Sequence, residues 1–259
     1  MAPTQKPSTI TPTANIDCTI LIALVSDICH YPRSLLPAPP SGPGGLYNSP
    51  AVNSQIAAES SNPVLPNELY PILTGRALVC VPEAEAHVQQ IVDTMATASE
   101  RARMSIIFAK DAYSDRPRSA LVSAMADLST HAVPADLELP ITLTAFPPPN
   151  PNFPGTVARR VCARIFPDLD PLNKPIVLFG WAAGFTTVTS NGVLMHKLER
   201  AINRVLEEEE KEGRGDAVVD GFTAPSVYLC RAPRSLVGKQ RQHRRGQESG
   251  KGGRSEADG

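Results

Sequence analysis

NIDCTILIALVSDICH, residues 15–30, has the pattern of a short apolar strand that runs directly into an apolar helix, with Asp17 at the junction. A lone carboxylate is costly to bury unless it is paired, hydrogen-bonded or bound to a metal. Two interpretations of Asp17 follow from its position. It is either a metal ligand at the end of a strand or a cap of the helix that begins after it.

Strand and helix patterns alternate along the rest of the chain. Helices are predicted over 83–110, 118–129 and 193–212, with Gly213 as the stop of the last one. Further strands are predicted in RALVC (76–80), KPIVLFGWAAG (174–184), FTTVTSNG (185–192, ending in an Asn-Gly turn) and SVYLC (226–230), and a short one within 135–155. Such alternation predicts an α/β fold, with a mostly parallel central sheet flanked by helices. In this architecture ligands bind at the carboxyl ends of the strands.

The 26 prolines are about twice the usual share of roughly 5% and they cluster, which predicts long irregular connections. We therefore expect a single α/β domain with disordered ends. The predicted divisions are a tail over 1–14, a domain over 15–237 with Pro-rich loops at 31–68 and 145–156, and a basic tail over 238–259.

Composition narrows the partners and the cellular compartment. The formal net charge is -1, so no overall field attracts nucleic acid or an anionic membrane. The longest apolar runs are too short to cross a bilayer, which predicts a protein without membrane contact. The five cysteines are odd in number and form no C-x-x-C pair, which favours a reducing compartment, cytoplasmic or nuclear. The basic residues of the C-terminal tail are interpreted as a solvated segment rather than a phosphate-binding site.

The opening stretch resembles the first motif of PIN-like nucleases: a strand ending in Asp17, a small hydroxyl residue at Thr19, and an apolar helix start. The resemblance implies a site in which three or four carboxylates from different strand ends hold Mg²⁺ or Mn²⁺ against a phosphodiester. Hard divalent cations prefer oxygen ligands, and the metal stabilises charge on the attacking and leaving oxygens.

Four stretches taken in order are similar to the eukaryotic family of domain of unknown function 1308, whose members carry a PIN-like domain. They are NIDCTILIALVSDICH, RALVCVPEAEAHVQQIVDTMATASERAR with DRPRSAL, NKPIVLFG with TTVTSNG, and SVYLCRAPRSLVG. Compared with the family pattern, His87 stands where an acid is expected, and Ala182 or Ala183 stands where a second acid is expected. Of the acidic set only Asp17 is present, while Asn191 matches a family asparagine.

The resemblance assigns tentative roles to several residues. Asp17 and Asn191 are the candidate metal ligands, and the hydroxyls of Thr19, Thr189 and Ser190 are candidates for contacts with nucleic acid. Trp181 is expected to fill the cleft that a lost carboxylate leaves, or to stack on a base.

The helix after the second strand offers three more candidates. Glu83 and Glu85 are interpreted as first-turn acids that favour the helix dipole, with a role as substitute ligands left open. His87 is interpreted as a half-exposed helix residue within reach of Glu83, with metal binding or base catalysis as the alternative.

Three functions remain open from the sequence. The first is a catalytically degenerate PIN-like domain that binds RNA or a protein partner. The second is an active divalent-metal-dependent ribonuclease whose site Asp17, Asn191 and one of Glu83 and Glu85 complete. The third is a structural module without nucleic-acid binding, in which Asp17 only caps a helix.

Overall fold

The computed structural model describes residues 10–36, 49–145, 156–213, 222–230 and 234–237. The predicted basic tail at 238–259 lies outside these residues, as do most of the predicted tail at 1–14 and most of the Pro-rich loop at 145–156. The statements below concern the described residues.

A five-stranded, all-parallel sheet forms the centre of the structure, in the order β3-β2-β1-β4-β5. The strands are β1 (Thr13–Ile16), β2 (Ala77–Cys80), β3 (Thr142–Leu143), β4 (Thr186–Thr189) and β5 (Val227–Leu229). This sheet confirms the predicted α/β class. In the central strand, Ala14 is in register with Leu78 of β2 and Thr186 of β4. β1 begins two residues before the predicted start, because Thr13 already pairs with Ala77.

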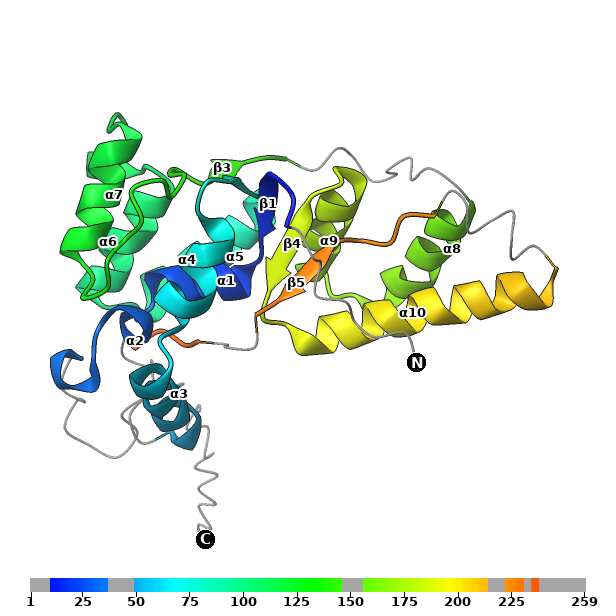
Figure 1. Cartoon of the computed structure of the whole chain (residues 1–259), viewed down its shortest axis with the longest axis horizontal. Coiled ribbons are helices and arrows are strands. Elements are labelled where there is room, and N and C mark those ends of the chain that lie inside the picture. Colours follow the sequence, from blue (N-terminus) through cyan, green and yellow to red (C-terminus); the bar gives the residue numbers. More distant parts are fainter. Residues whose placement is uncertain (1–9, 37–48, 146–155, 214–221, 231–233, 238–259) are drawn as a thin grey trace, which may run out of the picture.

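Helices flank the sheet, and Figure 1 shows α6 and α7 at one end of the molecule and α8 with the long α10 at the other. The α-helices are α1 (Cys18–Val25), α2 (Asp27–His30), α3 (Pro50–Ser61), α4 (Tyr70–Leu73), α5 (Pro82–Met95), α6 (Ala98–Ile107), α7 (Arg118–Asp127), α8 (Thr156–Ile165), α9 (Asn173–Ala182) and α10 (Gly192–Lys211). Single turns are formed by η1 (Arg33–Leu35), η3 (Leu65–Leu69, a π-turn), η4 (Asp111–Tyr113) and η5 (Phe166–Asp168).

Successive side chains of β1 point to opposite faces of the sheet, as the pleat requires. Ala14 and Ile16 belong to the main apolar cluster, together with residues of α1 and α5. Asn15 points to the other face, where its amide donates to the Ile176 carbonyl of α9 at 2.9 Å. A Cβ on Gly180 would stand 2.1 Å from the Thr187 hydroxyl oxygen, so glycine allows α9 to approach β1 and β4 closely.

The prediction of a strand in KPIVLFGWAAG is wrong, because these residues form most of α9. Ile176 and Phe179 pack in the main apolar cluster, whereas Val177, Leu178 and Trp181 pack in a second one with α8 and α10. A helix buried between two clusters is apolar on all sides and shows no 3.6-residue period. Its sequence therefore cannot be told from that of a buried strand by periodicity.

The predicted surface loop at 31–68 is also partly wrong, since α3 and η3 lie within it. Val52 and Ile56 are four positions apart and are both buried on one side of α3. Pro50 occupies the first turn of that helix, where a missing N–H costs nothing. The prolines that suggested a broken chain thus include one that begins a helix.

Other helix predictions are confirmed with changed boundaries. The helix predicted over 83–110 is two helices, because Thr97 interrupts it and caps α6. The amphipathic α10 and its stop at Gly213, where φ is +70°, agree with the prediction. At the predicted Asn-Gly turn, Asn191 caps α10. Within the described residues, no helix combines the length and the apolar character needed to cross a membrane.

Candidate functional site

The order of the strands places Asp17 at the topological switch point of the sheet, between β1 and β4. From β1 the chain adds β2 and β3 on one side, whereas β4 and β5 lie on the other side. Asp17 follows the last residue of β1, and Ser190 and Asn191 follow the last residue of β4. In open parallel sheets the crevice at such a switch point is the usual ligand site. The pairing of β1 with β4 therefore brings Asp17, Ser190 and Asn191 to the same edge of the sheet.

Two hydroxyl groups hold the Asp17 carboxylate, and we call Asp17, Thr19 and Thr189 the hydroxyl clamp. Thr19 Oγ1 donates to Asp17 Oδ2 at 3.0 Å, and Thr189 Oγ1 donates to the same oxygen. Each hydroxyl also accepts a backbone N–H: Thr19 from Ser190 at 2.8 Å, and Thr189 from Asn191 at 3.0 Å. The clamp thereby ties the start of α1 to the end of β4.

The Asp17 carboxylate is buried, with 1% of the residue exposed. Burial raises the pKa of this carboxyl group above its ordinary value, and the hydrogen bonds from Thr189 and Thr19 oppose that rise. Asp17 occupies the N-cap position of α1, but its side chain makes no capping hydrogen bond. The carboxylate turns toward β4, where Thr189 donates to it.

The remaining strand-end candidates make mostly local contacts. The Asn191 side-chain oxygen accepts the Leu194 N–H at 3.0 Å, which caps α10 and engages the atom that was expected to bind a metal. The Ser190 hydroxyl, next to the clamp, is buried and has no hydrogen-bond partner among the described residues. Ser190 is consequently the strand-end side chain here with unused hydrogen-bonding capacity.

The acids that were considered as substitute ligands are directed elsewhere. Glu85 forms an ion pair with Lys110, and Glu83 and His87 are exposed on α5. Among the described residues, no group of three or more His, Cys, Asp or Glu side chains is placed to hold a metal ion. A single carboxylate already engaged by two hydroxyls gives a divalent cation little charge compensation, so these residues do not fit a Mg²⁺ or Mn²⁺ site.

Trp181 and the two alanines after it lie away from the expected strand end. The Trp181 ring is buried in the second apolar cluster, where its N–H donates to the Thr223 carbonyl at 2.8 Å and its ring meets Phe222 edge-on. Ala182 and Ala183 end α9 and precede β4, so they stand before the strand whose other end carries Thr189. An acid at either position would not reach Asp17 across that strand.

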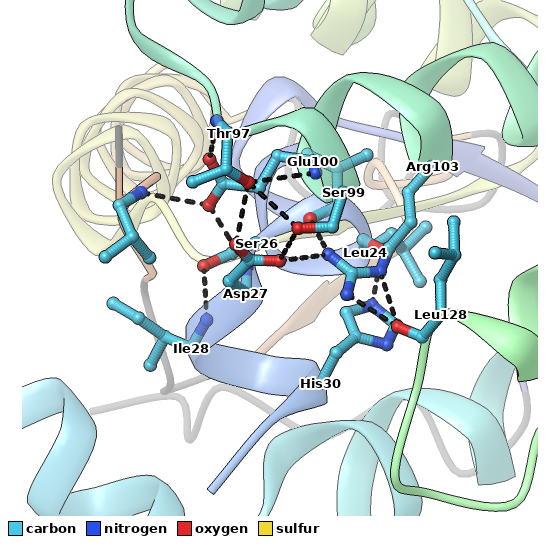
Figure 2. Close-up of polar contacts among 12 residues, drawn as sticks. Leu24, Ser26, Asp27, Ile28, His30, Thr97, Ser99, Glu100, Arg103 and Leu128 are labelled. Carbon is cyan, nitrogen blue, oxygen red and sulfur yellow. Dashed lines mark hydrogen bonds and ion pairs between the residues drawn. The ribbon is translucent and has the colours of Figure 1, made fainter. Parts of the chain in front are cut away.

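A second polar cluster, which the sequence analysis did not single out, surrounds Asp27 (Figure 2). Its carboxylate accepts from the Thr97 hydroxyl, the Ser99 hydroxyl and Arg103 Nη1, each at 2.7 Å. Arg103 also donates to the Val25 carbonyl at 2.8 Å and through Nε to the Leu128 carbonyl at 3.0 Å. We call Asp27, Thr97, Ser99, Glu100 and Arg103 the buried ionic hub.

Glu100 completes the hub by binding backbone groups. It accepts the N–H of Thr97 at 2.9 Å, of Asp27 at 3.1 Å and of Val237 at 2.9 Å. Burial raises the pKa of its carboxyl group, and these backbone donors lower it. One signal in the sequence points to part of the hub, since T-x-x-E at 97–100 is the pattern of a capping box.

The sheet topology defines an open, all-parallel α/β protein with a topological switch point between β1 and β4. Residues 14–131 match a family model described as protein of unknown function (DUF1308). Asp17, Thr19 and the whole ionic hub lie inside the matched segment, whereas Thr189 lies outside it. No curated protein and no solved structure matches the chain.

Proposed function

We propose that this chain is a PIN-like domain without metal-dependent nuclease chemistry, and that it binds a protein partner at the carboxyl end of its sheet. The observation that carries the proposal is the donor set at the switch point. Asp17 is held by two hydroxyls, and the described residues bring no second carboxylate, histidine or cysteine set to it that fits a metal. Metal-dependent hydrolysis of a phosphodiester needs a cation that stabilises charge on the attacking and leaving oxygens. This donor set does not fit such a cation.

The charge at the strand ends supports a protein partner over RNA. The segments 17–25, 81–88 and 190–196, which follow β1, β2 and β4, contain no lysine or arginine. Binding to a nucleic-acid backbone depends on such cations. Val193, in the first turn of α10, is 69% exposed and offers an apolar contact beside Ser190 and Asn191. A surface without lysine or arginine in these segments, and with an exposed aliphatic side chain, is better suited to a protein partner than to a phosphate backbone.

The state of the thiols supports the proposed compartment. Cys18, Cys29, Cys80 and Cys162 carry free thiols, and the first three are buried. Free buried thiols are typical of proteins that fold in a reducing environment. We therefore propose that binding takes place in the cytoplasm or the nucleus.

The first test separates the proposal from an active ribonuclease. Purified full-length chain is incubated with fluorescent single-stranded RNA and Mn²⁺ or Mg²⁺, beside the variant Asp17→Asn, which keeps the shape of the side chain. We expect no cleavage by either protein and no saturable heat when Mn²⁺ is titrated by calorimetry. Metal-dependent cleavage that Asp17→Asn abolishes overturns the proposal in favour of the ribonuclease.

The second test concerns the partner. Proteins recovered with the wild-type chain are compared with those recovered with Val193→Glu, and each candidate is then purified and its binding measured directly. The matched control is Leu35→Glu, which changes another exposed aliphatic residue, 60% exposed, in η1. We expect one purified partner to bind wild type and Leu35→Glu and to lose affinity for Val193→Glu. Saturable binding of RNA by anisotropy, weakened by Val193→Glu, would instead assign the surface to nucleic acid.

A further inference from the structure

A short segment, Arg234–Val237, packs between α2, α3 and α6. We call this segment the strap, and the surface of the three helices that it covers the groove. The strap belongs to no helix or strand. It contacts the groove at both ends. The Arg234 guanidinium pairs with Glu59 of α3 at 2.6 Å, and the Val237 N–H donates to Glu100 of α6 at 2.9 Å.

Between these ends, residues of the groove form hydrogen bonds with the backbone carbonyl and the side chain of Ser235. The Ser26 hydroxyl donates to the Ser235 carbonyl at 2.6 Å, and the Gln55 amide donates to the Ser235 hydroxyl at 3.2 Å. The last two side chains of the strap are buried: Leu236 packs in the main apolar cluster. Val237 packs in a third cluster formed with Ile28, Leu36, Val52 and Ile56.

The polar groups of the groove have partners of their own that do not involve the strap. Glu100 keeps the N–H groups of Thr97 and Asp27, and Ser26 keeps its capping bond from Ile28. Glu59 keeps the Val64 N–H at 2.9 Å. Removing the strap therefore leaves these side chains oriented by the rest of the fold, so the groove is preformed rather than created by its occupant.

We infer that this groove is a binding site for an extended peptide with arginine followed by aliphatic residues at the second and third positions after it. In this structure the chain's own strap is the occupant. A buried Glu59 gives a specific partner for the guanidinium, backbone donors and acceptors fix the extended course, and the apolar pocket takes the aliphatic pair. A partner protein that presents such a segment would compete with the strap for the groove.

The test uses the full-length chain with the strap weakened. Arg234→Glu places a like charge against Glu59 and leaves the groove unchanged. A fluorescein-labelled peptide of residues 231–240, RAPRSLVGKQ, is added, and binding is measured by anisotropy. We expect saturable binding to Arg234→Glu and binding about ten-fold weaker or more to wild type, because the wild-type strap fills the groove. The control peptide carries Glu in place of the residue that corresponds to Arg234, and should not bind.

A folded Arg234→Glu protein that does not bind the peptide overturns the inference, because the strap is then an integral part of the core. Hydrogen exchange in wild type gives a readout that needs no variant. The Val237 amide, bonded to Glu100, is compared with the Cys230 amide, which donates to the Thr189 carbonyl at 2.8 Å. We expect Val237 to exchange at least about ten-fold faster through local opening. Equal rates with the same denaturant dependence would also contradict an exchangeable strap.

Discussion

Asp17 and Asp27 stand ten positions apart in the stretch that begins the fold, and both are buried. Both also accept hydrogen bonds from two hydroxyl groups. They differ in one respect: Asp27 has the Arg103 guanidinium at 2.7 Å, whereas the hydroxyl clamp gives Asp17 hydrogen bonds but no cation. Asp27 is thus a buried carboxylate whose charge is neutralised by a guanidinium, whereas the clamp offers Asp17 hydroxyl donors.

The difference separates a role in stability from a role in binding. An ion pair that is buried and hydrogen-bonded at every donor holds elements together, and the hub does so for α2 and α6. Burial without a cation leaves Asp17 with a raised pKa, which means that the fold favours its neutral form. Stability does not account for a carboxylate at that position.

The largest effect is expected when the cation of the hub is removed. Arg103→Ala leaves the Asp27 carboxylate buried without its cation, and we expect a loss of about 3–5 kcal/mol in the free energy of unfolding. Urea denaturation followed by circular dichroism measures it. The control is Arg101→Ala, on the exposed side of the same helix, which should change stability by less than about 0.5 kcal/mol. A loss for Arg103→Ala as small as that of the control would contradict the view that Arg103 stabilises the buried Asp27 carboxylate.

The part of this comparison that the sequence could supply is limited to local patterns. Asp17 was identified because it follows an apolar run at a strand end, and alternating strand and helix patterns gave the parallel sheet. The sequence does not reveal the hub, because Asp27 contacts Ser99 and Arg103, which lie 72 and 76 positions further along the chain. Only the T-x-x-E pattern at 97–100 is local enough to be seen, and it reports a helix start rather than an ionic cluster.

The errors about Ala182 and Ala183 have a physical origin. Their assignment to a strand end depended on reading KPIVLFGWAAG as a strand. In the structure this run is apolar because two clusters enclose α9, and no pattern in a single sequence shows which neighbours enclose a segment. The contrast with α10 is instructive, since its one apolar face and its charged face made the helix predictable.

A second, smaller effect concerns the pH dependence of stability through His30, which lies near Arg103 of the hub. His30 is fully buried, its Nε2–H donates to the Leu24 carbonyl at 2.8 Å, and the Arg103 guanidinium adds positive charge nearby. Burial and then Arg103 lower its pKa well below 6.5, so the folded protein keeps this ring neutral. The unfolded chain takes up a proton near pH 6.5, so stability is lost as pH falls below that value, by up to about 1.4 kcal/mol per pH unit.

His30→Gln removes this titration and places an amide donor near the Leu24 carbonyl. The melting temperatures of wild type and variant are compared between pH 7.5 and about pH 5 by differential scanning fluorimetry. We expect the wild-type melting temperature to fall more steeply than that of the variant. His87→Gln, at an exposed position of α5, is the control and should follow wild type. Parallel curves for wild type and His30→Gln would mean that the fold does not resist protonation of His30.

The smallest effect in free energy, and the most informative about function, is expected at the clamp. Asp17→Asn keeps an oxygen that can accept from Thr19 and Thr189 and removes the buried charge. We expect its free energy of unfolding at pH 7 to equal that of wild type or exceed it by up to about 1 kcal/mol. Asp27→Asn, the matched change in the hub, should instead be strongly destabilising, because it removes the charge that Arg103 needs.

Acid conditions sharpen the contrast between the two variants. Because the pKa of Asp17 is raised in the fold, its contribution to stability is present at low pH and is lost as pH rises through the folded-state value. Any advantage of Asp17→Asn over wild type should therefore shrink as pH falls. If Asp17→Asn instead costs as much as Asp27→Asn, the hydroxyl clamp stabilises charge as well as a guanidinium does, and the carboxylate needs no functional explanation. If it costs nothing, the charge at the switch point is carried for a ligand rather than for the fold.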